Sequence, residues 1–274
     1  MNTTNCLVCG SDQKTLVTKQ TFPDHYLDII GLDYKKVSRN IVKCDDCDLT
    51  YRDPILDDGD LEILYKRFRD ISFRNESPDE YFDRITGLPD NQSENVARIN
   101  WLHKIMPERF KHGGKILDIG CGGGVFLHTF ANMNPGWILH GVEPTLSFSE
   151  LASRRLGCKV FNGPYKPRLF TDKFDLITIN QVLEHVQSPL EFLRGVAQDL
   201  KKNGFIYIEV PDIRDFDYLP PDHDRFLMQH LSIFSSETLR ITCQKAGLHV
   251  YHVKHAITIR QRHNLIAVCG VEDI

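Results

Sequence analysis

The sequence predicts an α/β protein with a doubly wound, seven-stranded, mostly parallel sheet and a small N-terminal cysteine module. Three observations support this prediction. Apolar runs typical of buried strands alternate with amphipathic helical segments from residue 115 onward. A glycine-rich turn directly follows the first of these runs. Two Cys-x2-Cys pairs lie within residues 1–52, ahead of the alternating pattern.

The cysteine pairs are Cys6/Cys9 and Cys44/Cys47. Their pattern is typical of a tetrathiolate zinc site, in which each tight turn contributes two sulfurs. Gly10 and Asp48 follow the pairs, and both tolerate the left-handed backbone that often occurs there. We therefore expect structural Zn²⁺ held by all four thiolates, with no coordination position open for catalysis. The alternatives are disulfides, which a reducing compartment disfavours, and a redox Cys-x-x-Cys, which needs no duplicate.

The segment between the two pairs is too short and too polar to fold on a core of its own, so a metal cross-link would stabilise it. We expect a hairpin or a short helix there, with these apolar residues on its inner side: Phe22, Tyr26, Leu27, Ile29 and Ile30. Cys121 lies apart from the pairs, inside the glycine-rich turn. We expect it to fill space rather than to act as a nucleophile.

Residues 53–110 are predicted to form a helical linker that caps the active site. Asp53-Pro54 ends the cysteine module, because the residue before a proline is disfavoured in a helix. Residues 57–69 and 78–86 are predicted to form short helices. Residues 95–106 are predicted to form a longer one, ended by Pro107.

Residues 111–274 are predicted to form the cofactor-binding domain. The predicted parallel strands are 115–119, 137–142, 158–162, 173–180 and 204–210. The predicted helices are 123–133, 146–156, 189–201 and 235–246. The last two apolar runs, 248–253 and 265–269, have no helix between them, so we expect them to pair antiparallel.

The glycine-rich turn and the end of the next strand contain five residues of chemical interest: Asp118, Gly120, Gly122, Gly124 and Glu143. Glycines at such a turn let a ligand approach the backbone closely. A carboxylate at the next strand end can accept hydrogen bonds from two ribose hydroxyls. The dinucleotide fingerprint would require a third glycine where Val125 stands, and no phosphate-loop Gly-Lys-Ser/Thr follows.

These five residues resemble the signature of class I S-adenosylmethionine-dependent methyltransferases. The resemblance implies that S-adenosylmethionine binds across the first two strand tips, with S-adenosylhomocysteine as product. Asn180-Gln181-Val-Leu-Glu-His185-Val resembles the loop after the fourth strand in that group, which implies that Asn180 and Gln181 contact the methionine part of the cofactor. Pro144 or Tyr165 is the candidate to stack on adenine.

The cysteine module joined to this core resembles sugar methyltransferases of polysaccharide and natural-product pathways. C-methylating members carry Tyr-His-Glu-His where this chain has Leu227-Met228-Gln229-His230. Since the tyrosine and the carboxylate are missing, a hydroxyl or amine acceptor is favoured, and C-methylation remains an alternative. The expected substrate is a nucleotide-linked sugar or a polysaccharide precursor.

His230 and His185 are the candidate general bases, because both are predicted near the mouth of the cofactor site and histidine titrates near neutral pH. The alternative is that each one hydrogen-bonds a loop carbonyl and holds the loop in place. The pair His223-Asp224 is expected to be a solvated loop rather than part of a metal site.

The formal net charge of −4, from 33 basic and 37 acidic residues, gives no basic field that would hold a polyanion. An RNA methyltransferase that grips nucleic acid through the cysteine module is an alternative. Its basic residues would be Lys35, Lys36, Arg39 and Lys43. A non-enzymatic partner module with a degenerate core is a third class, against which the five intact residues of the cofactor signature argue.

The sequence predicts no membrane span, because it has no run of eighteen or more apolar residues. The first residues lack the cationic and apolar regions of a secretory signal. We therefore expect a cytoplasmic protein with reduced cysteines. The oligomeric state is left open.

Overall fold

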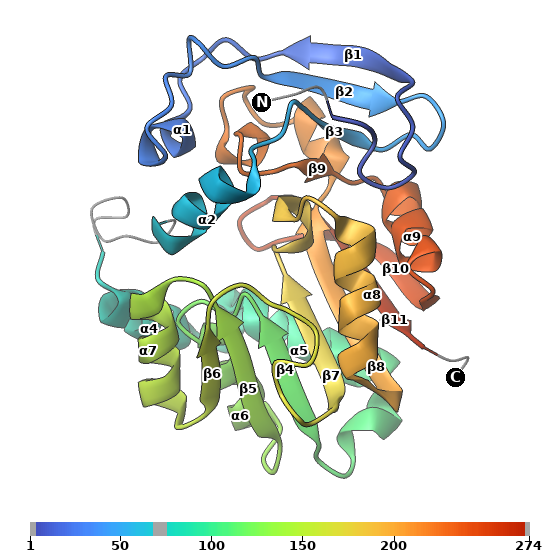
Figure 1. Cartoon of the computed structure of the whole chain (residues 1–274). Helices are drawn as coiled ribbons and strands as arrows, with labels where there is room; N and C mark the ends of the chain where they lie inside the picture. The colour runs from blue at the N-terminus through green and yellow to red at the C-terminus, as the bar shows by residue number, and fades with distance from the viewer. Residues whose placement is uncertain (1–3, 68–75, 272–274) are drawn as a thin grey trace.

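The computed structural model describes residues 4–67 and 76–271. Residues 1–3, at the predicted non-secretory N-terminus, and residues 68–69, at the end of the predicted helix 57–69, lie outside this range. Figure 1 shows two sheets, a large one flanked by helices and a smaller N-terminal one above it, with a short helix between them. The two sheets share one buried cluster of apolar residues, so they form a continuous core.

The large sheet has seven strands in the order β10-β11-β8-β7-β4-β5-β6. Their bounds are β4 (Lys115–Ile119), β5 (Ile138–Glu143), β6 (Lys159–Asn162), β7 (Phe174–Asn180), β8 (Leu200–Pro211), β10 (His249–Ile257) and β11 (His263–Gly270). The pairs β4–β5, β4–β7, β5–β6 and β7–β8 are parallel, whereas β11 is antiparallel to both of its neighbours. The predicted fold class and the antiparallel pairing of the last two strands are therefore confirmed.

Helices cover both faces of this sheet (Figure 1). They are α5 (Glu94–Ile105), α6 (Val125–Met133), α7 (Leu146–Leu156), α8 (Pro189–Asp199) and α9 (Ser236–Lys245). Alternate strand residues face opposite layers, as the pleat requires. Leu117 and Ile177 pack in the cluster with α8 and α9, while Ile116 and Leu176 pack in the cluster with α5 and α6. Burial on both faces explains why these strands read as continuous apolar runs.

The linker contains α2 (Asp58–Arg67) and α4 (Pro78–Thr86). Ser77 caps α4 through a reciprocal capping box with Glu80, with hydrogen bonds of 3.2 and 2.8 Å. Short 3-10 helices occur at η1 (Asp90–Gln92), η2 (Pro107–Phe110), η3 (Leu183–His185), η4 (Ile213–Asp217) and η5 (Asp224–Phe226). Over residues 4–67 and 76–271, no helix has the length and apolar character needed to cross a bilayer.

The smaller sheet has four antiparallel strands in the order β1-β2-β3-β9. Their bounds are β1 (Lys14–Lys19), β2 (Asn40–Cys44), β3 (Thr50–Asp53) and β9 (Ser232–Ile233), with α1 (His25–Ile29) between β1 and β2. The expected short helix between the cysteine pairs is present, and Tyr26 and Leu27 are buried on it. The sheet itself was not predicted. Its last strand comes from the C-terminal half of the chain, so the N-terminal segment is built into the main fold.

Candidate active site

The glycine turn after β4 brings the start of α6 close to the tip of β5. Gly120 and Gly124 have φ values of +73° and +83°, which a residue with a side chain rarely adopts. A Cβ at Gly120 would also lie 2.5 Å from Val182 Cγ2, and one at Gly124 would lie 2.7 Å from Leu156 Cδ1. Gly120 thus lets the β7 loop approach the turn, while Gly124 lets α6 pack on α7.

Glu143 fastens this turn to the end of β5. Its carboxylate is buried and accepts hydrogen bonds from Gly122 N at 2.8 Å and Thr145 N at 2.9 Å, one on each oxygen. Each carboxylate oxygen can accept a second hydrogen bond. The side chain therefore orders the turn and keeps acceptor capacity for two hydroxyls of a ribose.

Asp118 lies beneath the turn and accepts a hydrogen bond from the Thr178 hydroxyl at 2.6 Å. Burial raises the pKa of Asp118 to about 7, despite the stabilising hydroxyl of Thr178. Cys121 is also buried, and burial raises the pKa of its thiol well above the usual value. A neutral, buried thiol is what the expected space-filling role requires.

The raised pKa of Asp118 predicts a pH-dependent stability. The folded chain holds this proton more tightly than the unfolded chain, whose aspartate pKa is about 3.9, so stability falls as the pH rises from about 4 to about 7. Asp118→Asn cannot ionise and should escape this loss. We expect urea unfolding to show the variant gaining up to about 4 kcal/mol on the wild type between pH 4 and pH 8. Parallel pH curves for the two proteins would refute the assignment.

The end of β7 carries buried amide groups that lack partners. Neither amide atom of Asn180, nor Nε2 of Gln181, has a hydrogen-bond partner among the described residues. Gln181 also has a positive φ of 54°, and its backbone N–H donates to Glu209 O at 2.8 Å. Leaving buried amides unsatisfied costs about 1–3 kcal/mol each, so such groups indicate a place where a polar ligand binds.

Of the two adenine-stacking candidates, Pro144 directly follows Glu143 and is partly buried. Its carbonyl accepts a hydrogen bond from Asn162 Nδ2 at 3.2 Å. Tyr165 faces α8 instead: its hydroxyl donates to Asp199 at 2.7 Å, and its ring packs edge-on to Phe192. Pro144 is therefore the better placed of the two.

The structure brings the two candidate histidines together, with ring centroids 4.7 Å apart. His185 Nδ1 donates to Gln229 O at 2.7 Å, and His230 Nδ1 donates to Arg225 O at 2.8 Å. Since each carbonyl can only accept, Nδ1 carries the proton and Nε2 carries the lone pair in both rings. Burial lowers the pKa of His230 well below its usual value, so this ring is neutral. Both rings thus hold their loops through Nδ1, and Nε2 is unprotonated in each.

Glu184, to which the sequence analysis gave no role, completes this group. Its side chain is 1% exposed, and neither carboxylate oxygen has a hydrogen-bond partner among the described residues. Oε1 lies 3.8 Å from His185 Nε2. Ligand atoms of Glu184, His185 and His230 all lie within 4.8 Å of one another. The only sequence signal was its place beside His185, in the phrase that resembles the methyltransferase loop.

The N-terminal sheet and α2 hold the loops that carry these histidines. Arg52, fully buried on β3, donates from Nε to His230 O at 3.1 Å and from its backbone N–H to Leu231 O at 3.0 Å. The hydroxyl of Tyr65 on α2 donates to His185 O at 2.7 Å. The carbonyl of Tyr65 accepts from the Thr145 hydroxyl at 3.0 Å, so α2 bridges the β5 and β7 loops.

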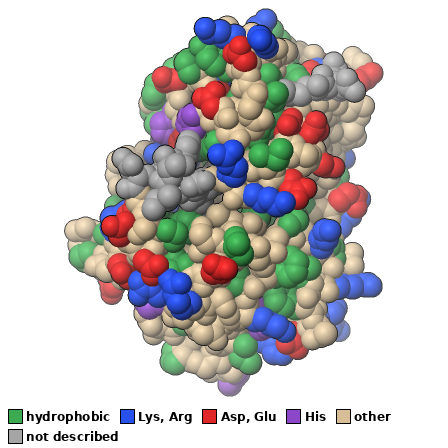
Figure 2. Space-filling view, turned by 60° about the vertical axis from the view of Figure 1, so that its left-hand side comes forward, with side chains coloured by type: hydrophobic (Ala, Val, Ile, Leu, Met, Phe, Trp, Pro, Cys, Tyr) green, Lys and Arg blue, Asp and Glu red, His purple; other side chains and the backbone are tan. Residues whose placement is uncertain are grey.

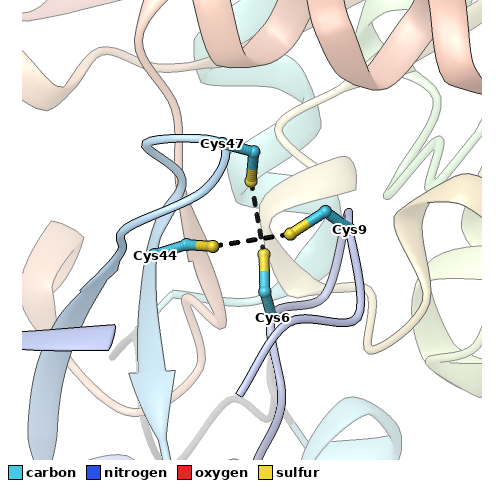
Figure 3. Close-up of side chains that lie close together, drawn as sticks. All are labelled: Cys6, Cys9, Cys44 and Cys47. Atoms are coloured by element: carbon cyan, nitrogen blue, oxygen red, sulfur yellow. Dashed lines mark hydrogen bonds between the residues drawn. The ribbon is translucent and has the colours of Figure 1, made fainter. Parts of the chain in front are cut away.

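The four N-terminal cysteines converge on one point (Figure 3). Two sulfur pairs, Cys6–Cys47 and Cys9–Cys44, are each 3.4 Å apart, and all four sulfurs lie within 4.8 Å of one another. A disulfide needs about 2.05 Å, whereas four sulfurs about 2.3 Å from a tetrahedral zinc ion lie about 3.8 Å apart. Gly10 and Asp48 have φ values of +78° and +61°, so the predicted left-handed conformations are confirmed. The arrangement fits a tetrathiolate metal centre rather than two disulfides.

A seven-stranded sheet of this order, with a glycine turn after β4 and a carboxylate at the tip of β5, defines the class I S-adenosylmethionine-dependent methyltransferase fold. Comparison with known families agrees. Residues 92–253, more than half of the chain, match the family described as "Methyltransferase domain", and the chain belongs to that family.

The chain is 29% identical over 119 residues to the mitochondrial ubiquinone biosynthesis O-methyltransferase of Schizosaccharomyces pombe, covering 40% of this chain and 43% of that protein. It is also 29% identical over 120 residues to the tRNA U34 carboxymethyltransferase of Desulfotalea psychrophila, covering 41% and 36%. The chain thus spans less than half the length of these relatives. Magnesium protoporphyrin IX methyltransferase of Synechocystis PCC 6803 shares the fold, with a TM-score of 0.55, 14% identity and coverage of 79% and 98%.

Proposed function

We propose that this chain transfers a methyl group from S-adenosylmethionine to a hydroxyl group of a small sugar, either nucleotide-linked or part of a surface-polysaccharide precursor. The observation that supports this most strongly is the group of acceptor atoms on Glu184, His185 and His230. Glu184 and His185 lie on the loop after β7, which ends at the unsatisfied amide of Asn180. Proton-accepting groups are needed where a weakly acidic hydroxyl attacks. Oxygen is also the acceptor atom in the names of several relatives, which are O-methyltransferases of ubiquinone biosynthesis.

The residues around the glycine turn fit the cofactor. Glu143 offers acceptor capacity for the ribose hydroxyls, Gly120 and Gly122 provide the close turn, and Asn180 and Gln181 offer amides for the methionine end. When bound, S-adenosylmethionine supplies the electrophilic methyl group on its sulfonium. The contribution of the protein is to align the acceptor behind that methyl group and to exclude water.

The histidines would accept the hydroxyl proton as the oxygen attacks. Nδ1 of each ring is held by a backbone carbonyl, so Nε2 is the basic atom in both. General-base assistance of this kind contributes about 10²–10⁴-fold. Tyr65 on α2 ties the His185 loop to the Thr145 loop, which supports a capping role for residues 53–110 over the active site.

The cysteine cluster is proposed to hold structural Zn²⁺ through Cys6, Cys9, Cys44 and Cys47. Four thiolates leave no open position, so the ion would not activate a water molecule or a substrate. Its role would be to fix β2 and the turn to β3, which in turn position Arg52 against the His230 loop.

The alternative acceptors fit less well. The basic residues expected to grip RNA include Arg39, which is fully buried beside Asp24, and Lys43, which pairs with Asp48 at 2.6 Å. On the face shown in Figure 2, basic and acidic side chains are interspersed. C-methylation would need carbanion-assisting groups near His230, but Met228 packs in a buried apolar cluster with α1 and α2.

The test is methylation of a nucleotide-sugar panel and of bulk tRNA by the wild type and by His230→Ala. We expect transfer to a sugar hydroxyl, with kcat reduced about 10²–10⁴-fold in the variant and S-adenosylhomocysteine affinity unchanged by calorimetry. His112→Ala, on an exposed turn, serves as the control. Transfer to tRNA alone would overturn the acceptor, and unchanged turnover would remove His230 from the reaction.

A further inference from the structure

The Glu184, His185 and His230 side chains bring together three groups that accept hydrogen bonds or bind cations. The carbonyls of Gln229 and Arg225 fix the protons of both imidazoles on Nδ1. This leaves Nε2 as the lone-pair atom in each ring. Among the described residues, no donor reaches either oxygen of the Glu184 carboxylate, although the residue is 1% exposed.

The spacing of these atoms suits a shared cation better than a direct hydrogen bond. Glu184 Oε1 and His185 Nε2 are 3.8 Å apart, beyond hydrogen-bond range. All three ligand atoms lie within 4.8 Å of one another. Ligands about 2.1 Å from a metal ion are separated by about 3.0–4.2 Å, depending on geometry. Small side-chain rotations would therefore bring all three onto one ion.

The unpaired carboxyl oxygens of Glu184 lead to the same conclusion. Polar atoms that are buried without a partner cost free energy unless a ligand or an ion binds them. The guanidinium of Arg225 makes no hydrogen bond to these oxygens, since it is held by Asp215 and by Asn264 Oδ1, the latter at 2.6 Å. A divalent cation would bind a Glu184 oxygen together with Nε2 of both imidazoles. Two neutral imidazoles and one carboxylate are a donor set for first-row divalent ions such as Fe²⁺, Mn²⁺ and Co²⁺.

We propose that Glu184, His185 and His230 form a second metal site, distinct from the cysteine cluster, that binds a divalent first-row cation. Three protein ligands leave coordination positions open. If the chain is the proposed sugar methyltransferase, these open positions would bind oxygens of the acceptor. The site would then favour substrates in which a hydroxyl lies beside a second oxygen, as in sugars. A hydroxyl bound to a divalent cation loses its proton more readily, and with both Nε2 atoms held as ligands that proton passes to solvent water instead of to a histidine.

The test measures binding of Mn²⁺ alone, by electron paramagnetic resonance, to the full chain with its cysteine cluster loaded with zinc. Mn²⁺ prefers nitrogen and oxygen ligands to thiolates, so the two sites are distinguished. Co²⁺ is titrated in parallel and followed by its visible absorption. A Co²⁺ spectrum that lacks the thiolate-to-metal charge-transfer band shows that the ion is bound by nitrogen and oxygen, not by the cysteines. We expect one ion per chain. Glu184→Gln, which keeps the shape and removes the charge, should weaken binding at least about 100-fold.

The exposed Glu191→Gln serves as the matched control and should bind both ions like the wild type. Calorimetry with S-adenosylhomocysteine shows that Glu184→Gln is folded. If neither Mn²⁺ nor Co²⁺ binds the wild type, or if Glu184→Gln binds equally well, the second metal site is wrong. The methyltransferase proposal would survive that result, with the histidines as proton acceptors, whereas failure of the wild type to bind S-adenosylhomocysteine would overturn the proposed function itself.

Discussion

Replacing Glu143 by alanine is expected to weaken S-adenosylhomocysteine binding by at least about 100-fold. The carboxylate accepts the backbone N–H groups of Gly122 and Thr145, and it is the proposed partner of the ribose hydroxyls. Hydrogen bonds to a charged group contribute about 1.5–3 kcal/mol each, and 100-fold in affinity is about 2.7 kcal/mol. Loss of the loop anchor and of the ribose contacts together should reach that value.

Calorimetry with S-adenosylhomocysteine measures this directly. Glu143→Gln keeps one acceptor oxygen but turns an amide N–H₂ toward a backbone donor, so it should fall between the wild type and the alanine variant. Glu150→Gln, on the exposed side of α7, controls for the loss of a negative charge nearby. Wild-type affinity in Glu143→Ala would show that the cofactor lies elsewhere.

The large sheet could be predicted because its signals are local. Leu117 and Ile119 face one layer while Ile116 faces the other, and both layers are covered, so β4 reads as an unbroken apolar run. The N-terminal sheet gave no such signal. β1 is mostly exposed, and β9 has two residues whose partners on β3 lie far away in the sequence. Strand pairing between such distant segments gives no local hydrophobic periodicity from which the sheet could be predicted.

The site divides in the same way. The glycine turn and Glu143 lie on neighbouring elements, so their spacing in the sequence reports their function. The cluster of Glu184, His185 and His230 joins two loops more than forty residues apart. Its chemistry depends on which imidazole nitrogen is held by a carbonyl and on the absence of a described donor to Glu184, and neither fact is written in the sequence.

Arg52 connects the cysteine cluster to the proposed chemistry. Arg52 lies on β3, a few residues after Cys44 and Cys47, and is fully buried. Its side chain donates to the carbonyl of His230, 178 residues further along the chain. Gln20 Oε1 accepts from the same guanidinium at 2.5 Å, so two segments of the N-terminal module meet there. The module is therefore better described as a support for the His230 loop than as a separate binding appendage.

Loss of the metal proposed for the cysteine cluster is expected to loosen the N-terminal sheet and to reduce turnover far more than cofactor affinity. Structural zinc contributes about 10–16 kcal/mol in zinc-finger peptides, so β2 and β3 should open when Cys44→Ser removes a ligand. Arg52 would then release the His230 loop, and kcat should fall about 10²-fold or more. Glu143 and the glycine turn belong to the large sheet, so S-adenosylhomocysteine affinity should stay within about threefold of the wild type.

Hydrogen exchange over residues 40–53, steady-state kinetics and calorimetry follow these three effects separately. Cys158→Ser, outside the cluster, is the matched control. If Cys44→Ser does not accumulate as folded protein, brief chelation of the purified wild type provides the same comparison, with activity restored by added Zn²⁺. Normal exchange and normal turnover after verified metal loss would show that the cluster does not position His230. Equal loss of cofactor binding and turnover would show instead that the metal stabilises the whole fold. Releasing Arg52 alone should not disturb Glu143, which lies on the large sheet.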